Sequence, residues 1–216
     1  MTETVLHVAD TDHAADGHTD DGHAGGGHRT STGLSNEKLA MWAFLGSECL
    51  LFGGLISVFL INRVKPVVSG PEVHELYDIP FTSVSSFVLL MSSLTMVLAL
   101  AALKRGEHRQ ARTWILATAT LGASFVAGQV YEFTSFVKEG MGFTTSLQSS
   151  SFYTLTGFHG VHVTLGIVML LSLYVLSLRG KLPTAKSESL EIVGLYWHFV
   201  DVVWILIFTV VYLIEP

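Results

Sequence analysis

The sequence predicts an all-α integral membrane protein, a bundle of five transmembrane helices, and three observations lead to this fold class. Half of the 216 residues are hydrophobic and only 14% are charged, which is too apolar for a soluble domain that must cover its surface with polar groups. Five apolar runs are each long enough to cross a bilayer core of about 30 Å, which takes about 20 helical residues. The linkers between these runs contain the charges and prolines that are typical of loops.

Residues 1–36 precede the first apolar run and differ from it in composition. They are rich in Gly, Asp, Thr and His and contain six of the eighteen acidic residues. A segment with so few apolar side chains cannot bury enough surface to fold, so we expect a disordered cytoplasmic tail. Its histidines could instead collect copper or zinc, because neutral imidazole is a good ligand for both metals. These histidines are His7, His13, His18, His23 and His28.

The transmembrane domain is predicted over residues 37–216. Ser35 is a suitable N-cap for the first helix, because its hydroxyl can accept a bond from the first free backbone N–H groups. The five spans are expected at about 37–62, 81–103, 113–136, 151–178 and 190–214.

The distribution of Lys and Arg among the linkers predicts the orientation, since these residues are retained on the cytoplasmic side. The N-terminal segment, the second linker and the fourth linker contain nine of them, whereas the first and third linkers contain three. We therefore expect the N-terminus in the cytoplasm and the C-terminus outside. Beyond the acidic tail the charges nearly balance, so the sequence indicates no nucleic-acid partner.

Helix association inside lipid depends on small residues and polar contacts, because lipid tails are as apolar as leucine. Alanines repeat every four residues on the third span and predict a smooth packing face: Ala119, Ala123 and Ala127. Aromatic residues near span ends are expected at the membrane–water interface. These are Trp42, Trp197 and Tyr212.

Glu48 is the most unusual side chain of the first span. It lies about midway along the run, and no Lys or Arg lies within a helical turn of it. A carboxyl group at that depth is costly unless it is paired, hydrated or neutral. Two interpretations follow, a carboxyl linked to proton uptake or an acid that bonds a neighbouring helix. The sequence favours the first, since Gln or Ser could serve a purely structural bond.

Six further polar residues occur in pairs three residues apart, and each pair therefore shares one helix face. The pairs are Gln129 with Glu132, His159 with His162, and His198 with Asp201. We expect an interhelical polar cluster, with hydrogen bonds among His159, His198 and Asp201. A metal site would need more ligands in a defined geometry, so the sequence assigns none.

Five motifs resemble subunit III of the heme-copper respiratory oxidases, the cytochrome c oxidase subunit III family. The paired stretches FYTLTGFHGVH, which ends at His162, and YWHFVDVVW, which ends at Trp204, are the most specific. The segments WAFLGSE, ending at Glu48, SSLTM, ending at Met96, and GQVYEF, ending at Phe133, add to them. The resemblance covers about residues 37–214 and leaves the histidine-rich tail outside.

The resemblance implies a subunit of a proton-translocating terminal oxidase in the aerobic respiratory chain of a bacterial inner membrane. Its expected partners are the catalytic subunit I, subunit II, membrane lipids and cytochrome c as the electron donor. The chain itself is expected to carry no cofactor, since no span offers axial histidines for haem and Cys49 alone cannot form a dicopper thiolate site. Haem and copper would reside in the partners, and this subunit would stabilise subunit I and support proton uptake, the role that the resemblance gives to Glu48.

The long form of the family has seven helices, and this chain matches its last five. That number indicates the short bacterial form. In the long form the two extra helices help to enclose a cleft that holds phospholipids, so the resemblance leaves bound phospholipid open here, together with membership of a respiratory supercomplex.

Three alternatives compete with this interpretation. Relatives of this subunit also accompany quinol oxidases and nitric oxide reductases, and the donor site would lie on other chains. A small secondary transporter would use Glu48 and Asp201 to couple protons to a solute, but the sequence shows no inverted repeat. In the third alternative, the histidine-rich tail collects copper or zinc for the oxidase.

Overall fold

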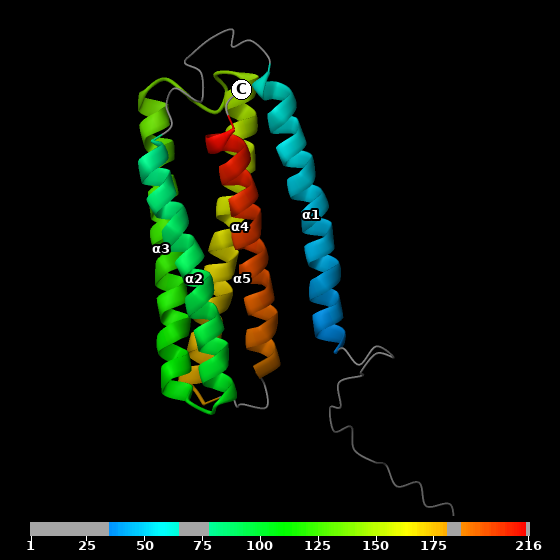
Figure 1. Cartoon of the computed structure of the whole chain (residues 1–216), viewed down its shortest axis with the longest axis vertical. Helices are drawn as coiled ribbons and strands as arrows, with labels where there is room; N and C mark the ends of the chain where they lie inside the picture. Colours follow the sequence, from blue (N-terminus) through cyan, green and yellow to red (C-terminus); the bar gives the residue numbers. More distant parts are fainter. Residues whose placement is uncertain (1–34, 65–77, 181–186, 215–216) are drawn as a thin grey trace, which may run out of the picture. The chain divides into compact units, whose positions relative to one another are not determined.

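Five long helices make up nearly all of the computed structural model, which describes residues 35–64, 78–180 and 187–214 (Figure 1). The helices are α1 (Asn36–Arg63), α2 (Ile79–Lys104), α3 (His108–Lys138), α4 (Leu147–Leu178) and α5 (Ser187–Phe208), and a π-helical turn, η3 (Thr209–Leu213), continues α5. All five are long and apolar enough to cross a membrane, and no strand occurs in the described ranges. The predicted fold class is therefore confirmed. Residues 1–34 of the predicted tail lie outside the described residues, and Asn36, its last residue, begins α1.

Polar side chains fix where the helices begin. The Asp78 carboxylate accepts a bond of 3.1 Å from the Phe81 backbone N–H and caps α2, whose first turn contains a proline. Ser146 caps α4 in the same way through the N–H of Ser149. Helices α3 and α4 begin at His108 and Leu147, a few residues before the predicted spans, because their first turns are polar and fall outside the apolar runs.

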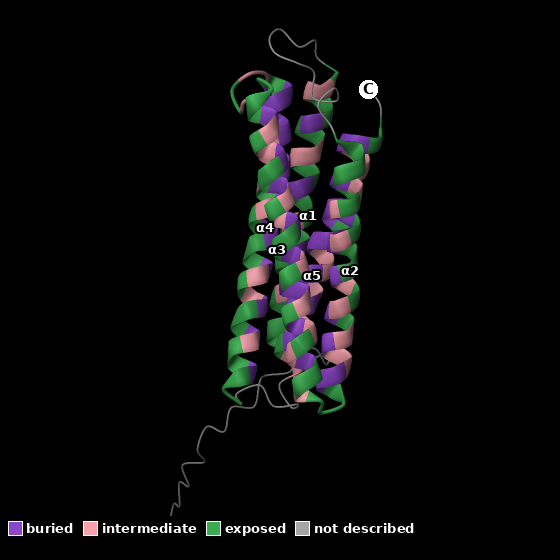
Figure 2. Ribbon diagram, turned by 90° about the vertical axis from the view of Figure 1, so that its left-hand side faces the viewer, coloured by how far each residue is buried: buried purple, intermediate pink, exposed green. Residues whose placement is uncertain are grey.

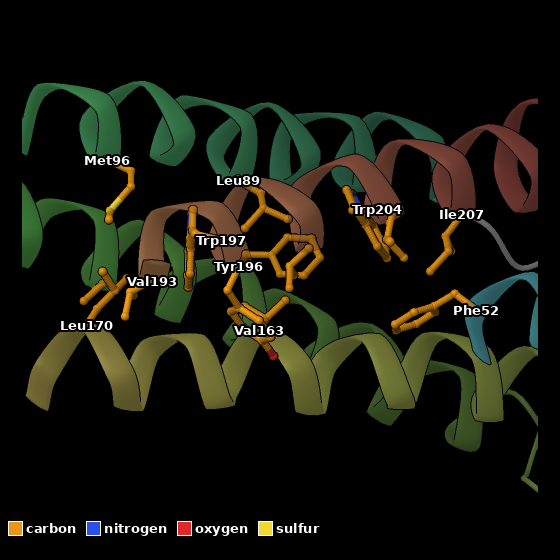
Figure 3. Close-up of a cluster of buried hydrophobic side chains, with 14 of the residues drawn as sticks. Phe52, Leu89, Met96, Val163, Leu170, Val193, Tyr196, Trp197, Trp204 and Ile207 are labelled. Carbon is orange, nitrogen blue, oxygen red and sulfur yellow. The ribbon is translucent and has the colours of Figure 1, made fainter. Parts of the chain in front are cut away.

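Helices α2 to α5 pack in a closed ring in which each packs mainly against two neighbours: α2 lies against α3 and α5, and α4 lies against α3 and α5. The buried residues lie on the inner faces of these helices, and exposed residues cover the outward faces (Figure 2). Figure 3 shows the core, where side chains of α2, α4 and α5 meet.

Trp197 is the centre of this core, and the expectation that it lies at the membrane interface is wrong. Its side chain is fully buried, and its indole N–H donates a bond of 2.9 Å to the Ser92 hydroxyl of α2. Trp204 repeats the arrangement two turns along with Ser86, at 2.8 Å. A tryptophan on α5 can go inside because a serine on α2 satisfies its N–H. Tyr212 is also buried, whereas Trp42 is exposed.

The Trp197 ring fits between two glycines on neighbouring helices. A Cβ atom on Gly122 of α3 would lie 2.5 Å from the ring, and one on Gly166 of α4 would lie 2.8 Å from it. The indole therefore occupies the space that a side chain at position 122 or 166 would need. Through these contacts Trp197 packs α5 against both α3 and α4.

The predicted alanine face of α3 is only partly used for packing. Ala119 is buried, but Ala123 and Ala127 are exposed. The buried stripe of α3 contains larger residues, among them Phe125 and Phe136. The sequence pattern failed here because the core of this ring is filled by aromatic side chains, which need large as well as small neighbours.

Helix α1 packs differently from the other four. Only three of its side chains are buried, Leu45, Phe52 and Phe59. Aromatic contacts join it to its neighbours: Phe44 stacks on Tyr196 of α5 with ring centroids 6.4 Å apart, and Phe52 meets His162 of α4 edge-on at 5.0 Å. With so little apolar burial, polar contacts must contribute much of what holds α1 to the bundle.

Candidate functional site

Glu48 of α1 and His162 of α4 form a direct pair inside the membrane-spanning part of the chain. The Glu48 carboxyl Oε2 lies 3.1 Å from His162 Nε2, and the two side chains are 14% and 10% exposed. The other ring nitrogen of His162, Nδ1, lies 2.7 Å from the backbone carbonyl of Phe158. This contact within α4 orients the imidazole so that its Nε2 faces α1.

This arrangement fixes the number of protons that the pair shares. The Phe158 carbonyl can only accept, so His162 Nδ1 must carry a hydrogen. The contact between Nε2 and the Glu48 carboxyl then needs one more proton, which belongs either to the acid or to the imidazole. The pair is hydrogen-bonded in both cases, as a neutral acid with a neutral imidazole or as an ion pair, and it can keep its contact in either state.

Neighbouring side chains enclose the pair. The Phe52 ring lies against the imidazole from α1, and the Tyr196 hydroxyl of α5 donates a bond of 2.9 Å to the backbone carbonyl of His162. The site thus joins α1, α4 and α5. It can hold a proton and hold helices together.

Polar contacts also fasten α1 near both of its ends. At its start, Lys38 forms an ion pair of 2.7 Å with Glu191 of α5, which pairs at the same distance with Lys104 of α2. At its end, the Arg63 guanidinium donates a 2.7 Å bond to the carbonyl of Val210 in the π-helical turn and a second bond to that of Ile214. Carbonyls at a helix C-terminus lack intrahelical partners, and a basic side chain satisfies them.

Sequence reasoning missed these end contacts, because it used Lys38, Lys104 and Arg63 only to predict orientation. The signal available was the position of each charge within a turn of a span end. The partners could not be found that way, since Glu191 lies more than 150 residues from Lys38 along the chain.

His198 and Asp201 meet through a residue that sequence reasoning did not select. The Ser93 hydroxyl of α2 lies 3.0 Å from His198 Nδ1 and donates a bond to Asp201 Oδ2. Ser93 belongs to the SSLTM motif, so the motif itself was the available signal. This group joins α2 to α5.

His159 does not join that group, and the predicted hydrogen bonds among His159, His198 and Asp201 are not what the structure shows. Neither ring nitrogen of His159 has a hydrogen-bond partner among the described residues, and the side chain is fully buried. Its ring stacks on Trp204 at 4.8 Å and meets Phe125 edge-on at 5.9 Å. The indole of Trp204, one turn from Asp201 on α5, fills the space beside the imidazole.

Gln129 and Glu132 share a face of α3 but bind different helices. The Gln129 amide donates a bond of 3.1 Å to the Thr156 carbonyl of α4. Glu132 Oε1 accepts a bond of 2.9 Å from the Thr82 hydroxyl of α2 and one of 3.3 Å from the Tyr212 hydroxyl of the π-helical turn. The six polar residues therefore lie in separate interhelical groups.

Replacing Glu132 by leucine should lower the thermal stability of the purified chain in detergent. Two hydrogen bonds from hydroxyls on other elements would be lost, and interhelical hydrogen bonds in membranes contribute about 0.6 kcal/mol each. We expect a loss of about 1 kcal/mol for Glu132→Leu and a smaller one for Glu132→Gln, which keeps a carbonyl acceptor. Unfolding followed by circular dichroism measures both. Equal losses would show that the hydrogen bonds contribute nothing.

Within the ranges that the structure describes, no three His, Cys, Asp or Glu side chains are grouped so that they could hold a metal ion. The histidines of the predicted metal-collecting tail lie outside these ranges.

Comparison with known proteins gives a family match over most of the chain. A family model described as cytochrome c oxidase subunit III matches residues 18–215. Cytochrome c oxidase subunit 3 of Bacillus sp. strain PS3 is 40% identical over 178 residues, which are 82% of this chain and 86% of the relative. The probable quinol oxidase subunit 3 of Staphylococcus saprophyticus is 40% identical over 82% of this chain and 89% of the relative. The cytochrome bo(3) ubiquinol oxidase subunit 3 of Pseudomonas putida is 36% identical, with coverages of 82% and 84%.

Proposed function

Since this chain belongs to the cytochrome c oxidase subunit III family, we propose that it serves a proton-translocating cytochrome c oxidase as the subunit that stabilises the catalytic subunit and supports proton uptake. The family makes the chain a multi-pass bacterial membrane protein and part of a terminal oxidase complex with other oxidase subunits. Beyond this family assignment, the proposal specifies cytochrome c as the electron donor, proton translocation by the complex, and the role of this subunit within it. Haem and copper belong to the partner subunits in this proposal.

The observation that carries the proposal is the pair of Glu48 and His162. It joins α1, which has few buried side chains, to the ring of α2 to α5 at membrane depth. This supports a role for Glu48 in stabilising the helix bundle. The proton of this hydrogen bond can reside on either the carboxyl group or the imidazole, which supports the second candidate for Glu48, a role in proton uptake. The geometry favours the stabilising role, because the carboxyl group is already engaged with a neighbouring helix.

The electron donor is the finer part of the proposal. Relatives named cytochrome c oxidase subunit 3 support cytochrome c, and relatives named quinol oxidase subunit 3 define the alternative at the same identity of 40%. The electron donor would bind to partner subunits, so the test must include those subunits.

The testing experiment purifies the tagged chain in mild detergent with whatever subunits accompany it. A reduced-minus-oxidised spectrum with haem bands, a large catalytic subunit and a subunit with a dicopper motif are the expected results, together with oxidation of reduced cytochrome c. Oxidation of a quinol without a dicopper subunit would replace cytochrome c by quinol in the proposal. A colourless preparation without oxidase subunits would overturn it.

We also propose that the N-terminus faces the cytoplasm. The basic residues Lys38 and Lys104 support this orientation, because both pair with Glu191 and thus lie at one end of the bundle. The predicted tail of residues 1–36 would then lie in the cytoplasm.

A further inference from the structure

A groove of about 300 Å³ lies between α3 and α4 on the outer surface of the chain. Its lining is almost entirely apolar and includes Phe133 from α3 and Gly157, Gly160, Val161 and Thr164 from α4. Gly157 opens the groove further, since a Cβ atom added there would meet nothing within 4 Å. Small residues of this kind allow another helix to approach closely.

The floor of the groove contains a polar side chain with an unused acceptor. Gln129 is 7% exposed, and its only hydrogen bond among the described residues is the one from Nε2 to the Thr156 carbonyl. That carbonyl can only accept, so the amide nitrogen must face it and the amide oxygen must face away. The oxygen lies beside Gly160, 2.6 Å from where a Cβ atom would be, and thus on the groove side.

The depth of Gln129 makes this unused acceptor significant. Helix α3 has 31 residues and is about 46 Å long. Gln129 lies nine residues before its end at Lys138, or about 14 Å along the axis. A hydrocarbon core of about 30 Å centred on the helix therefore contains it. Water is absent there, and a polar group without a partner is costly.

We propose that this groove receives one transmembrane helix of a partner oxidase subunit, which places a small residue against Gly157 and donates a hydrogen bond to the Gln129 oxygen. A serine or threonine hydroxyl fits both requirements. A lipid tail would fill the space but cannot donate a hydrogen bond. The inference rests on the proposed function for the source of the helix.

A crosslinking experiment in the intact complex tests the position. The photoreactive residue is introduced as Val161→benzoylphenylalanine at the groove, and as Val202→benzoylphenylalanine on α5 for control, since the two valines are 58% and 56% exposed. We expect an adduct from position 161 that maps to a transmembrane helix of an oxidase subunit, with little or none from position 202. Adducts with lipid alone, equal adducts from both positions, or none would overturn the docking.

A matched pair of glycine substitutions tests the shape of the groove. Gly157→Leu should lower the recovery of the catalytic subunit with the tagged chain by about threefold or more, because the side chain fills the groove. Gly54→Leu on α1 is the control, since a Cβ atom there also meets nothing within 4 Å. Equal recovery from both variants would overturn the docking. If the unsubstituted chain recovers oxidase subunits but position 161 crosslinks to none, the docking fails while the proposed function stands. A chain that recovers no oxidase subunit overturns both.

Discussion

Replacing Gly122 or Gly166 by alanine should strongly destabilise the bundle. The added methyl group would lie 2.5 Å or 2.8 Å from the Trp197 ring, closer than any ordinary contact, and the ring is fully buried. Overpacking of a filled core costs about 1–3 kcal/mol, and we expect the upper end for Gly122 because its closest approach to the ring, 2.5 Å, is the shorter of the two. The measurement is the free energy of unfolding in mixed micelles.

The same clash predicts a rescue. Trp197→Leu removes the large ring and should be destabilising by about 3 kcal/mol or more, since contacts with three helices and the bond to Ser92 are lost. In that background Gly122→Ala should become nearly neutral. Gly54→Ala is the control with open space and should be neutral or slightly stabilising, because alanine favours the helix. Additive effects of Gly122→Ala and Trp197→Leu would refute the proposed fit.

Separating Glu48 from His162 should weaken the attachment of α1. Glu48→Ala leaves the imidazole Nε2 without its partner, and His162→Ala leaves the carboxyl group alone at membrane depth. An unsatisfied buried polar group costs about 1–3 kcal/mol, so each single variant should lose that much stability. The double variant should lose less than the sum by about 1 kcal/mol, the coupling expected of an interhelical bond.

Two readouts distinguish the roles of Glu48. If it stabilises the bundle, Glu48→Ala should shorten the lifetime of the assembled oxidase during turnover while the protons moved per electron stay the same. Ser47→Ala is the control, because among the described residues the exposed Ser47 hydroxyl bonds only the carbonyl of Phe44 in its own helix. A lower proton yield with unchanged assembly would instead assign Glu48 to proton uptake. Variants that match the unsubstituted protein in assembly, lifetime and proton yield would leave Glu48 without a role.

The five spans were predictable because length and apolar composition alone determine which segments cross a membrane. The polar residues of the site were also predictable one by one, since each is unusual at its depth. Their partners were not. Periodicity placed His159 and His162 on one helix face, but only the packing shows that His162 meets Glu48 while His159 lies on Trp204. Trp197 was misplaced for a similar reason, because its position near a span end does not reveal the serine and the two glycines that receive it.

The fastening of α1 has a consequence for the order in which the chain assembles. Lys38 needs Glu191, Glu48 needs His162, and Arg63 needs the carbonyls of Val210 and Ile214. All of these partners lie in α4, in α5 or in the residues that follow α5. During synthesis α1 therefore precedes all the residues that fasten it, and these contacts can form only after α4 and α5 have been made.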